Sequence, residues 1–340
     1  MLHTQFDVAL VDLDGVVYLG NDPVSHAVPA LNAVATQGTA LAYVTNNAGR
    51  TPDEVASHLC ELGLTTSPEQ VVTSAQAGAK VLRERLGGGP WPVLVVGGPG
   101  VRAAVLAQGM EPVDSADDDP VAVLQGFGRD LCWADLDEAS AAVGAGALWI
   151  ATNPDVSIPT PRGRAPGNGA FVHAVSLATG RSPDQIAGKP HAPLMLESIA
   201  RTGALRPLVI GDRLDTDIAA AAGVGIVSLL VFTGVSTISN VLRAPSGQRP
   251  DLMGLDLRTL FDVHPPVHRQ GQQWRAGPCS GGIDDRIGQV VLQGPIDTPA
   301  DWATACRVAC AVAWATAAAT DLVAQRLIAA AADLDSDPAR

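Results

Sequence analysis

The fold of this chain is decided near its N-terminus, by the segment Phe6-Asp7-Val8-Ala9-Leu10-Val11-Asp12-Leu13-Asp14-Gly15-Val16-Val17-Tyr18. An apolar run of the kind that forms a buried strand delivers Asp12 and Asp14 to a point where Gly15 turns the chain. Open α/β sheets place their ligands at the carboxyl ends of their strands. Two carboxylates at such an end are costly unless they bind something, although a pair that merely caps a turn is the alternative for this segment taken alone.

Three further segments place polar groups after predicted strands. Thr45-Asn46-Asn47 offers a hydroxyl and backbone amides, which suit a phosphate oxygen. Gly188-Lys189-Pro190 holds a lysine in a chain where lysine is very rare, and Gly211-Asp212-Arg213-Leu214-Asp215-Thr216-Asp217 brings more acid. Each segment alone is explained by a helix cap, a solvated turn or the acidic first turn of a helix. These separate structural explanations do not account for all four segments occurring together in this order.

Apolar runs alternate with helical patterns through the first 260 residues, which is typical of a parallel sheet covered by helices. The predicted strands are 6–13, 40–45, 92–96, 121–125, 148–151, 205–210 and 226–231. The predicted helices are 51–62, 75–86, 101–108, 136–145, 170–179, 192–202 and 216–222. After Pro266 the pattern changes to a glycine-rich stretch with one apolar run, 287–292, and one long alanine-rich helix from about 299 to 334, which we interpret as a separate appendage.

Composition excludes several classes of function. The 340 residues carry 22 basic and 35 acidic side chains, a net charge of -13 that repels nucleic acids and anionic membranes. We therefore expect no nucleic-acid and no membrane partner. The first residues lack a basic region before an apolar one, and five scattered cysteines without a Cys-x-x-Cys pair fit a reducing compartment, so we expect a cytoplasmic protein.

The four segments resemble the motifs of the haloacid dehalogenase superfamily. Asp12-Leu13-Asp14-Gly15, Thr45-Asn46-Asn47, Lys189 and the segment from Gly211 to Asp217 correspond to them in order, over roughly residues 1–262. The closest likeness within the superfamily is to the branch of NagD-type, p-nitrophenyl phosphatase and phosphoglycolate phosphatase enzymes. The resemblance implies an α/β fold: a Rossmann-like parallel-sheet core with a large α/β cap inserted between the second and third motifs, followed here by a small C-terminal α+β appendage.

The resemblance also implies a role for each motif residue. Asp12 would be the nucleophile that forms a phosphoaspartate, and Asp14 the general acid and base. Mg²⁺ would be held by Asp12, by the backbone carbonyl of Asp14 and by Asp212, with Asp217 supporting the metal or positioning the lysine. The phosphate oxygens would be held by Thr45, Asn46, Asn47 and Lys189.

Spacing locates the cap. The gap between Gly15 and Thr45 has room for one helix, whereas 144 positions separate Thr45 from Lys189 and leave space for a domain of about 100 residues. We predict a core at 1–85 and 182–262, a cap at 86–181 and an appendage of unknown role at 263–340. Within the cap, Asn153 and Asp155 are the candidate substrate contacts, with turn formation as the alternative.

Two other patterns favour structure over function. Gly98-Pro99-Gly100 opens a helix after a strand as a dinucleotide fingerprint does, but Pro99 removes an amide and the following acids precede a strand instead of ending one. His264 and His268 have the spacing of a metal pair, yet the prolines between them exclude a helix and indicate a linker.

The sequence therefore predicts a cytoplasmic, Mg²⁺-dependent phosphatase of a small phosphomonoester, with glycerol 3-phosphate or 2-phosphoglycolate as the best candidates. Sugar, pyridoxal or nucleotide monophosphates are the alternative substrates. A phosphotransferase or a non-catalytic sensor of a phosphorylated ligand is the alternative of another class, and a homodimer is possible.

Overall fold

The structure is a computed structural model that describes residues 1–160, 162–316 and 318–335. It divides into two compact units: Met1–Leu41 with Ala204–Arg340, and Ala42–Gly203. The predicted domain boundaries at residues 85, 181 and 262 are placed from the motifs and their spacing and divide the chain by expected function. They do not describe compact units, and they remain a prediction. In the part of the chain that the structure describes, no helix combines the length and the hydropathy needed to span a bilayer.

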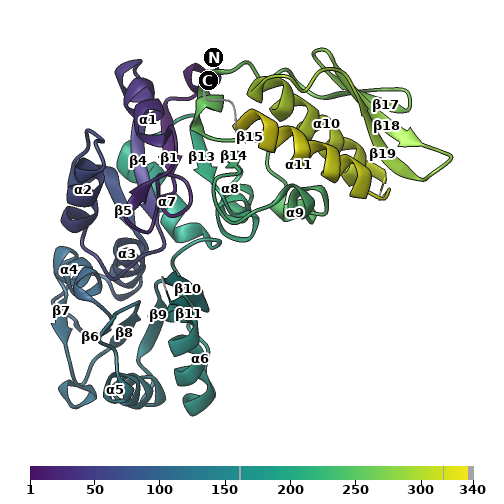
Figure 1. Ribbon diagram of the computed structural model, residues 1–340. Helices are drawn as coiled ribbons and strands as arrows, with labels where there is room; N and C mark the ends of the chain where they lie inside the picture. Colours follow the sequence, from purple (N-terminus) through teal and green to yellow (C-terminus); the bar gives the residue numbers. More distant parts are fainter. Residues whose placement is uncertain (161, 317, 336–340) are drawn as a thin grey trace. The chain divides into compact units, whose positions relative to one another are not determined.

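The first unit is built on parallel strands in the order β15-β14-β13-β1 (Figure 1). Strand β1 (Val8–Val11) pairs with β13 (Pro207–Gly211), which pairs with β14 (Val227–Val231), which pairs with β15 (Leu252–Gly254). Every residue of β1 is buried, as expected for a strand covered on both faces. Because β1 and β13 are parallel, Asp12 and Asp212, which directly follow them, leave the sheet at the same edge.

The remaining elements of the first unit are short, except in its C-terminal segment. They are β2 (Tyr18–Leu19), β3 (Asp22–Pro23), α1 (Ala27–Thr36), α8 (Ala219–Val224) and α9 (Ile238–Leu242). The C-terminal segment forms an antiparallel sheet of β16 (His268–Gln270), β17 (Gln273–Ala276), β18 (Cys279–Asp284) and β19 (Gln289–Gln293). Helix α10 (Pro299–Thr316) packs against this sheet, next to α11 (Asp321–Asp335) (Figure 1).

One hydrophobic cluster joins the C-terminal segment to the parallel sheet. Leu230 of β14 and Met253 of β15 belong to the same buried cluster as Trp302 and Cys306 of α10. The rings of Phe232 and Trp302 meet edge to face with their centroids 5.2 Å apart. The C-terminal segment therefore shares its core with the rest of the first unit and does not stand apart from it.

The long helix predicted from about 299 to 334 is wrong, because the structure contains two helices there. Ala319 lies between them in an isolated bridge with Gln289: its N–H donates to the carbonyl of Gly288, and its carbonyl accepts the N–H of Val290. These backbone bonds to the sheet replace the bonds that a continuous helix would make at this point. Thr320 and Asp321, residues typical of a helix start, then begin α11.

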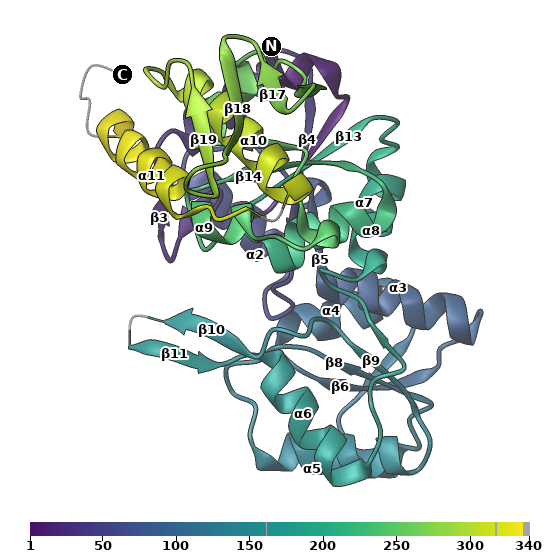
Figure 2. The same ribbon diagram turned by 90° about the vertical axis from the view of Figure 1, so that its right-hand side faces the viewer.

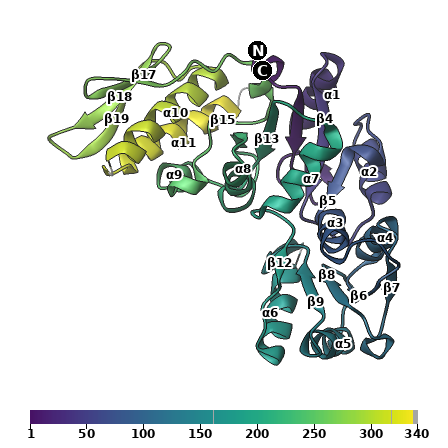
Figure 3. The same cartoon turned by 180° about the vertical axis from the view of Figure 1, so that it is seen from behind.

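The second unit contains a fully parallel sheet in the order β12-β9-β8-β6-β7. Its strands are β6 (Pro92–Val96), β7 (Glu111–Val113), β8 (Ala122–Gln125), β9 (Leu148–Ala151) and β12 (Gln185–Ile186). Val123 and Trp149 face α5 (Trp133–Gly144) and α6 (Asn168–Thr179), which cover one side. Leu124 and Ile150 point the other way, toward Gly78 of α3 (Ser74–Leu86), and α4 (Pro99–Ala107) packs beside α3 (Figures 2 and 3).

Two further parts complete this unit. Strand β4 (Ala40–Thr45) starts in the first unit and continues into the second, where it pairs in parallel with β5 (Val71–Thr73). The hairpin of β10 (Ser157–Thr160) and β11 (Gly163–Pro166) projects from the second unit (Figure 2). The remaining helices are α2 (Pro52–Glu61), which begins with a capping box at Thr51, and α7 (Ala192–Thr202).

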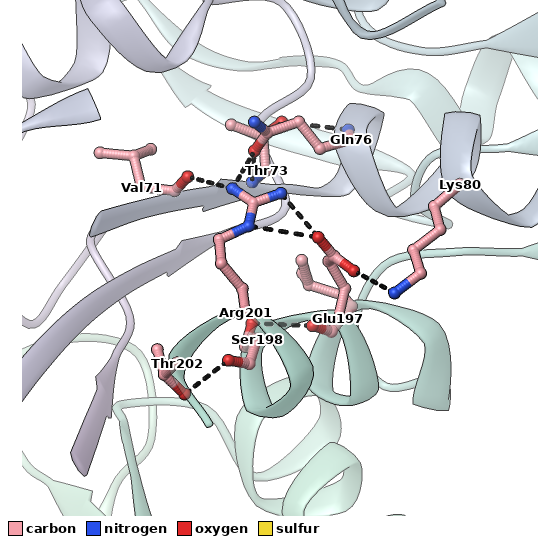
Figure 4. A network of polar contacts seen from close by, with 9 residues as sticks. Val71, Thr73, Gln76, Lys80, Glu197, Ser198, Arg201 and Thr202 are labelled. Carbon is pink, nitrogen blue, oxygen red and sulfur yellow. Dashed lines mark hydrogen bonds and ion pairs between the residues drawn. The ribbon is translucent and has the colours of Figure 1, made fainter. Parts of the chain in front are cut away.

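Helix α7 is tied to α3 and β5 by a charged network (Figure 4). Glu197 accepts from Lys80 at 2.6 Å on one oxygen and from Arg201 at 2.7 and 3.2 Å on the other. Arg201 also donates to the carbonyl of Val71 at 3.0 Å. The helix that follows the predicted phosphate-binding lysine is thereby held in place within the second unit.

Candidate functional site

A group of carboxylates lies at the carboxyl edge of the parallel sheet in the first unit. Asp12, Asp212 and Asp217 each offer one oxygen, and these oxygens lie within 4.8 Å of one another. Asp12 is 9% exposed, Asp212 0% and Asp217 1%. Two of the three were predicted as metal ligands and the third as their support, and the structure brings them together.

The loop after β14 completes the surroundings of Asp212. The N–H of Val235 donates to Oδ2 of Asp212 at 2.6 Å, and the hydroxyl of Thr233 donates to the carbonyl of Gly15 at 2.6 Å. A Cβ on Gly234 would lie 2.0 Å from Oδ2 of Asp212, so only glycine fits there. The sequence reading missed these residues, although their position directly after a parallel strand was the signal that marked the other motifs.

The three grouped carboxylates fit a magnesium ion. All of their donors are oxygens, the ligands that Mg²⁺ prefers, and they have no sulfur or nitrogen that would favour a softer metal. Three carboxylates this close and this buried repel one another, and a divalent cation among them removes that cost. Gly15, whose φ is +88°, adds to the fit, because a Cβ there would lie 2.6 Å from the carboxylate of Asp212.

Asp14 and Asp217 are held differently. Asp14 is exposed beyond the end of β1 and is not one of the three grouped carboxylates. Asp217 lies in a π-helical turn, Leu214–Ile218, and its Oδ2 accepts the N–H of Arg213 at 3.1 Å. In the same turn, hydrogen bonds and the positive charge of Arg213 outweigh partial burial and hold the pKa of Asp215 below its usual value. Asp215 is therefore an ion-paired surface acid outside the grouped carboxylates.

The second unit groups the residues predicted to hold phosphate. Thr45 ends β4, and its Oγ1 accepts the N–H of Asn47 at 3.0 Å. Lys189 is 2% exposed, and its Nζ donates to the carbonyl of Val44 at 3.1 Å. Oδ1 of Asn46 accepts the N–H of Lys189 at 2.8 Å, so the second and third motifs are in direct contact.

Asn153 and Asp155, the predicted substrate contacts, both hydrogen-bond to Asn46. Nδ2 of Asn153 donates to the carbonyl of Asn46 at 2.8 Å, and Oδ2 of Asp155 accepts Nδ2 of Asn46 at 3.1 Å. The N–H of Asp155 also donates to Oδ1 of Asn153 at 3.1 Å, which is the turn that the alternative foresaw. A direct contact of either side chain with substrate stays a prediction.

The glycines that mimic a dinucleotide fingerprint have a packing role. A Cβ on Gly100 would lie 2.2 Å from the carbonyl oxygen of Arg50, and a Cβ on Gly98 would lie 2.8 Å from that of Gly49. The N–H of Gly100 donates to the carbonyl of Gly49 at 3.2 Å. These glycines let the start of α4 approach the loop after Asn47, and this close packing accounts for the motif.

Known proteins with similar sequences point to one family. Residues 9–111 match the family model described as haloacid dehalogenase-like hydrolase, and residues 186–260 match a second model described as HAD-hydrolase-like. The D-glycerol 3-phosphate phosphatase of Mycobacterium tuberculosis is 46% identical over 256 residues, 75% of this chain and 71% of that protein. The chain belongs to the haloacid dehalogenase superfamily of hydrolases. The acid sugar phosphatase of Staphylococcus aureus is a further relative, 38% identical over 70% of this chain and 90% of its own.

Solved structures of this superfamily extend the likeness to the C-terminal segment. The glycerol phosphate phosphatase of Mycobacterium tuberculosis, solved in complex with magnesium, has a TM-score of 0.84 at 38% identity and covers 96% of this chain and 98% of its own. The p-nitrophenyl phosphatase of Archaeoglobus fulgidus has a TM-score of 0.70 at 27% identity and covers 76% of this chain and 99% of its own. Coverage of 96% has to include most of residues 263–340, so the mycobacterial structure has a counterpart of the C-terminal segment.

Proposed function

We propose that this protein is a Mg²⁺-dependent phosphatase that hydrolyses a small phosphomonoester through a phosphoaspartate on Asp12, with glycerol 3-phosphate as the best candidate substrate. The grouped carboxylates of Asp12, Asp212 and Asp217 are the observation that carries this proposal. The superfamily membership and the phosphatase relatives support the reaction class.

The proposed reaction has two steps. A carboxylate oxygen of Asp12 attacks phosphorus, the bond from phosphorus to the ester oxygen breaks, and Asp14 gives its proton to the departing alcohol. Asp14 then takes a proton from a water molecule, the water oxygen attacks the phosphoaspartate, and inorganic phosphate leaves Asp12 free. The exposed position of Asp14 beyond the strand end supports a role in exchanging protons with alcohol and water.

The other motif residues would bind the metal and the phosphate. Asp12, Asp212 and the Asp14 carbonyl would hold Mg²⁺, with Asp217 supporting them. When bound, Mg²⁺ neutralises the repulsion between the attacking carboxylate and the phosphate. The hydroxyl of Thr45, the backbone amides of Asn46 and Asn47 and the ammonium of Lys189 would hold the phosphate oxygens as charge spreads over them.

The relatives' names supply the substrate candidates. The glycerol phosphate phosphatase of Mycobacterium tuberculosis is similar in sequence and in structure, and the acid sugar phosphatase of Staphylococcus aureus makes sugar phosphates the second candidate class. We further propose that residues 86–181 act as the cap of this enzyme, since they supply four of the five strands of the parallel sheet in the second unit and the helices α5 and α6 on one of its faces.

Phosphate release from a panel of phosphomonoesters, with and without Mg²⁺, tests the proposal. We expect turnover that needs the metal, is fastest on glycerol 3-phosphate, and is lost in Asp12→Asn. Asp215→Asn is the matched control, because Asp215 is an ion-paired surface acid outside the grouped carboxylates. Release from no ester would overturn the proposal, and a phosphorylated alcohol as product would make the enzyme a phosphotransferase.

A further inference from the structure

The side chain of Asn46 holds the backbone of Lys189 from both sides. Its Oδ1 accepts the N–H of Lys189 at 2.8 Å, and its Nδ2 donates to the carbonyl of the same residue at 3.0 Å. Gly188 makes this approach possible, because a Cβ there would lie 2.5 Å from Oδ1 of Asn46. Two hydrogen bonds to one residue fix the direction in which the lysine side chain leaves the chain.

Asp155 holds the carboxamide of Asn46 in turn. A carboxylate can only accept hydrogen bonds, so it selects the NH₂ end of the carboxamide, which donates to Oδ2 of Asp155 at 3.1 Å. A bond from an amide to a charged acceptor is stronger than one between neutral groups. The NH₂ group of Asn46 therefore donates two hydrogen bonds, one to the carboxylate of Asp155 and one to the carbonyl of Lys189.

Both ends of this arrangement are built into the second unit. The backbone carbonyl of Asn46 accepts from the hydroxyl of Ser74 at 2.7 Å and from Asn153 at 2.8 Å. The carbonyl of Asp155 accepts the N–H of Gly169 at 2.9 Å, and a Cβ on Gly167 would lie 2.3 Å from that carbonyl oxygen. Asp155 is thus held at a fixed place instead of on a loose turn.

We propose that Asp155 is a positioning residue for Lys189 and acts through the carboxamide of Asn46. Its effect on catalysis rests on the proposed function, because it assumes that the lysine holds the phosphate. The lysine Nζ is buried and lies at the carbonyl of Val44, one residue before Thr45, so a small turn of the lysine backbone moves the ammonium away from the end of β4.

Steady-state kinetics of Asp155 variants form the first part of the test. Asp155→Ala removes the acceptor, and we expect kcat to fall about 10- to 100-fold with little change in KM, the loss typical of a misplaced catalytic group. Asp155→Asn keeps an acceptor of the same shape, so we expect it to recover most of kcat. Asp184→Asn is the control, because that carboxylate accepts the N–H of Trp149 at 2.8 Å elsewhere in the same unit.

A double variant separates this route from a direct contact with substrate. If Asp155 acts only through Asn46, then Asp155→Ala costs nothing further in an Asn46→Ala background. A rise in KM alone, additive costs in the double variant, or no recovery in Asp155→Asn would overturn the proposal.

Lysine labelling forms the second part and needs no enzyme activity. The chain has only two lysines, Lys80 and Lys189, so in a Lys80→Arg background the buried lysine is the only ε-amine. We expect trinitrobenzenesulfonate to label it several-fold faster after Asp155→Ala than before, counted by mass spectrometry of its peptide. Equal labelling rates would overturn the positioning role, whereas absent phosphatase activity in the parent protein would overturn the proposed function and leave this comparison valid.

Discussion

Gly234 is the residue whose replacement tests the proposed metal site most directly. In Gly234→Ala the new Cβ would lie 2.0 Å from Oδ2 of Asp212, so the carboxylate has to move. We expect the Mg²⁺ concentration for half-maximal activity to rise at least about tenfold, as for other losses of groups that orient metal ligands. A magnesium titration of phosphate release measures this.

Gly223→Ala is the control for this prediction. Gly223 lies in α8, nothing lies within 4 Å of its Cβ position, and alanine favours a helix by about 1 kcal/mol over glycine. If Gly234→Ala leaves the magnesium requirement unchanged although the carboxylate of Asp212 has moved, then Asp212 does not hold the metal.

His264 gives the protein a pH-dependent term in its stability. Burial lowers the pKa of the His264 imidazole; its bond to the carbonyl of Thr259 opposes this shift, and the positive charge of Arg307 adds to it. The unfolded chain therefore binds more protons than the folded one between the lowered pKa and about 6.5, so stability falls as pH drops below about 6.5.

His264 and His268 form a matched pair for this measurement, although His268 lies in β16 and not in the linker that the sequence predicted. We expect the melting temperature to fall less between pH 7.5 and pH 5.5 in His264→Gln than in the parent protein. His268 is exposed, so His268→Gln should behave like the parent. Equal losses in both variants would contradict the assignment.

Among single residues, the sequence predicted those whose position next to a strand or turn can be recognised from the neighbouring residues alone. Asp12, Asp212 and Asp217 each follow a recognisable strand or turn, and they meet in the structure. Thr233 and Gly234 were missed because their role depends on a hydrogen bond and a close approach to residues far away in the chain.

Among the elements, the charged network of α7 makes a separate prediction. Glu197→Gln removes the charge that pairs with Lys80 and Arg201, whose side chains are 36% and 27% exposed. We expect the free energy of unfolding to fall by about 1 kcal/mol, since such partly exposed pairs are weakened by solvent. Urea unfolding measures this.

Glu84 provides the comparison on the neighbouring helix. Its side chain is exposed near the end of α3, so Glu84→Gln should change stability by less than about 0.5 kcal/mol. Equal effects at both positions would mean that the network contributes nothing specific. The Lys80→Arg variant should unfold like the parent, because arginine keeps the positive charge beside Glu197.

The elements buried in parallel sheets were predicted most accurately. The predicted strands 40–45, 92–96 and 148–151 match the observed bounds, because continuous apolar runs mark strands covered on both faces. For α1 the sequence predicted only room for one helix between Gly15 and Thr45, without its bounds. Strand β5 and the hairpin of β10 and β11 were not predicted, because their apolar runs are short or mixed. In the C-terminal segment, β16 is polar throughout, β17 alternates exposed polar residues with Trp274 and Ala276, and β19 has the apolar run.

At the scale of the whole molecule, the C-terminal segment is part of the core of the first unit. A chain ending at residue 262 would lose Trp302 and Cys306 and uncover Leu230 and Met253, which share their cluster. We expect this shortened chain to be insoluble or to melt far below the full protein, in a thermal unfolding experiment on the soluble fraction.

A point variant separates the effect of losing buried packing from the effect of removing the whole C-terminal segment. Trp302→Ala in the full chain should cost about 3 to 5 kcal/mol, because Trp302 is fully buried. A shortened chain that unfolds cooperatively at the parent's melting temperature would contradict the shared core. The sequence predicted a separate segment because alanine and cysteine, which form most of the packed face of α10, give no strong amphipathic pattern.

The way the first unit is assembled from both ends of the chain also matters while the protein is being made. Strand β1 pairs with β13, so Val8 has to wait for Pro207 to be synthesised, an interval of about 10 to 40 s at ordinary translation rates. The second unit is one continuous stretch and can begin to fold on the ribosome during that time. The strand that leads to Asp12 is therefore among the first parts of the chain to emerge, yet its pairing with β13 can form only after the whole second unit has been synthesised.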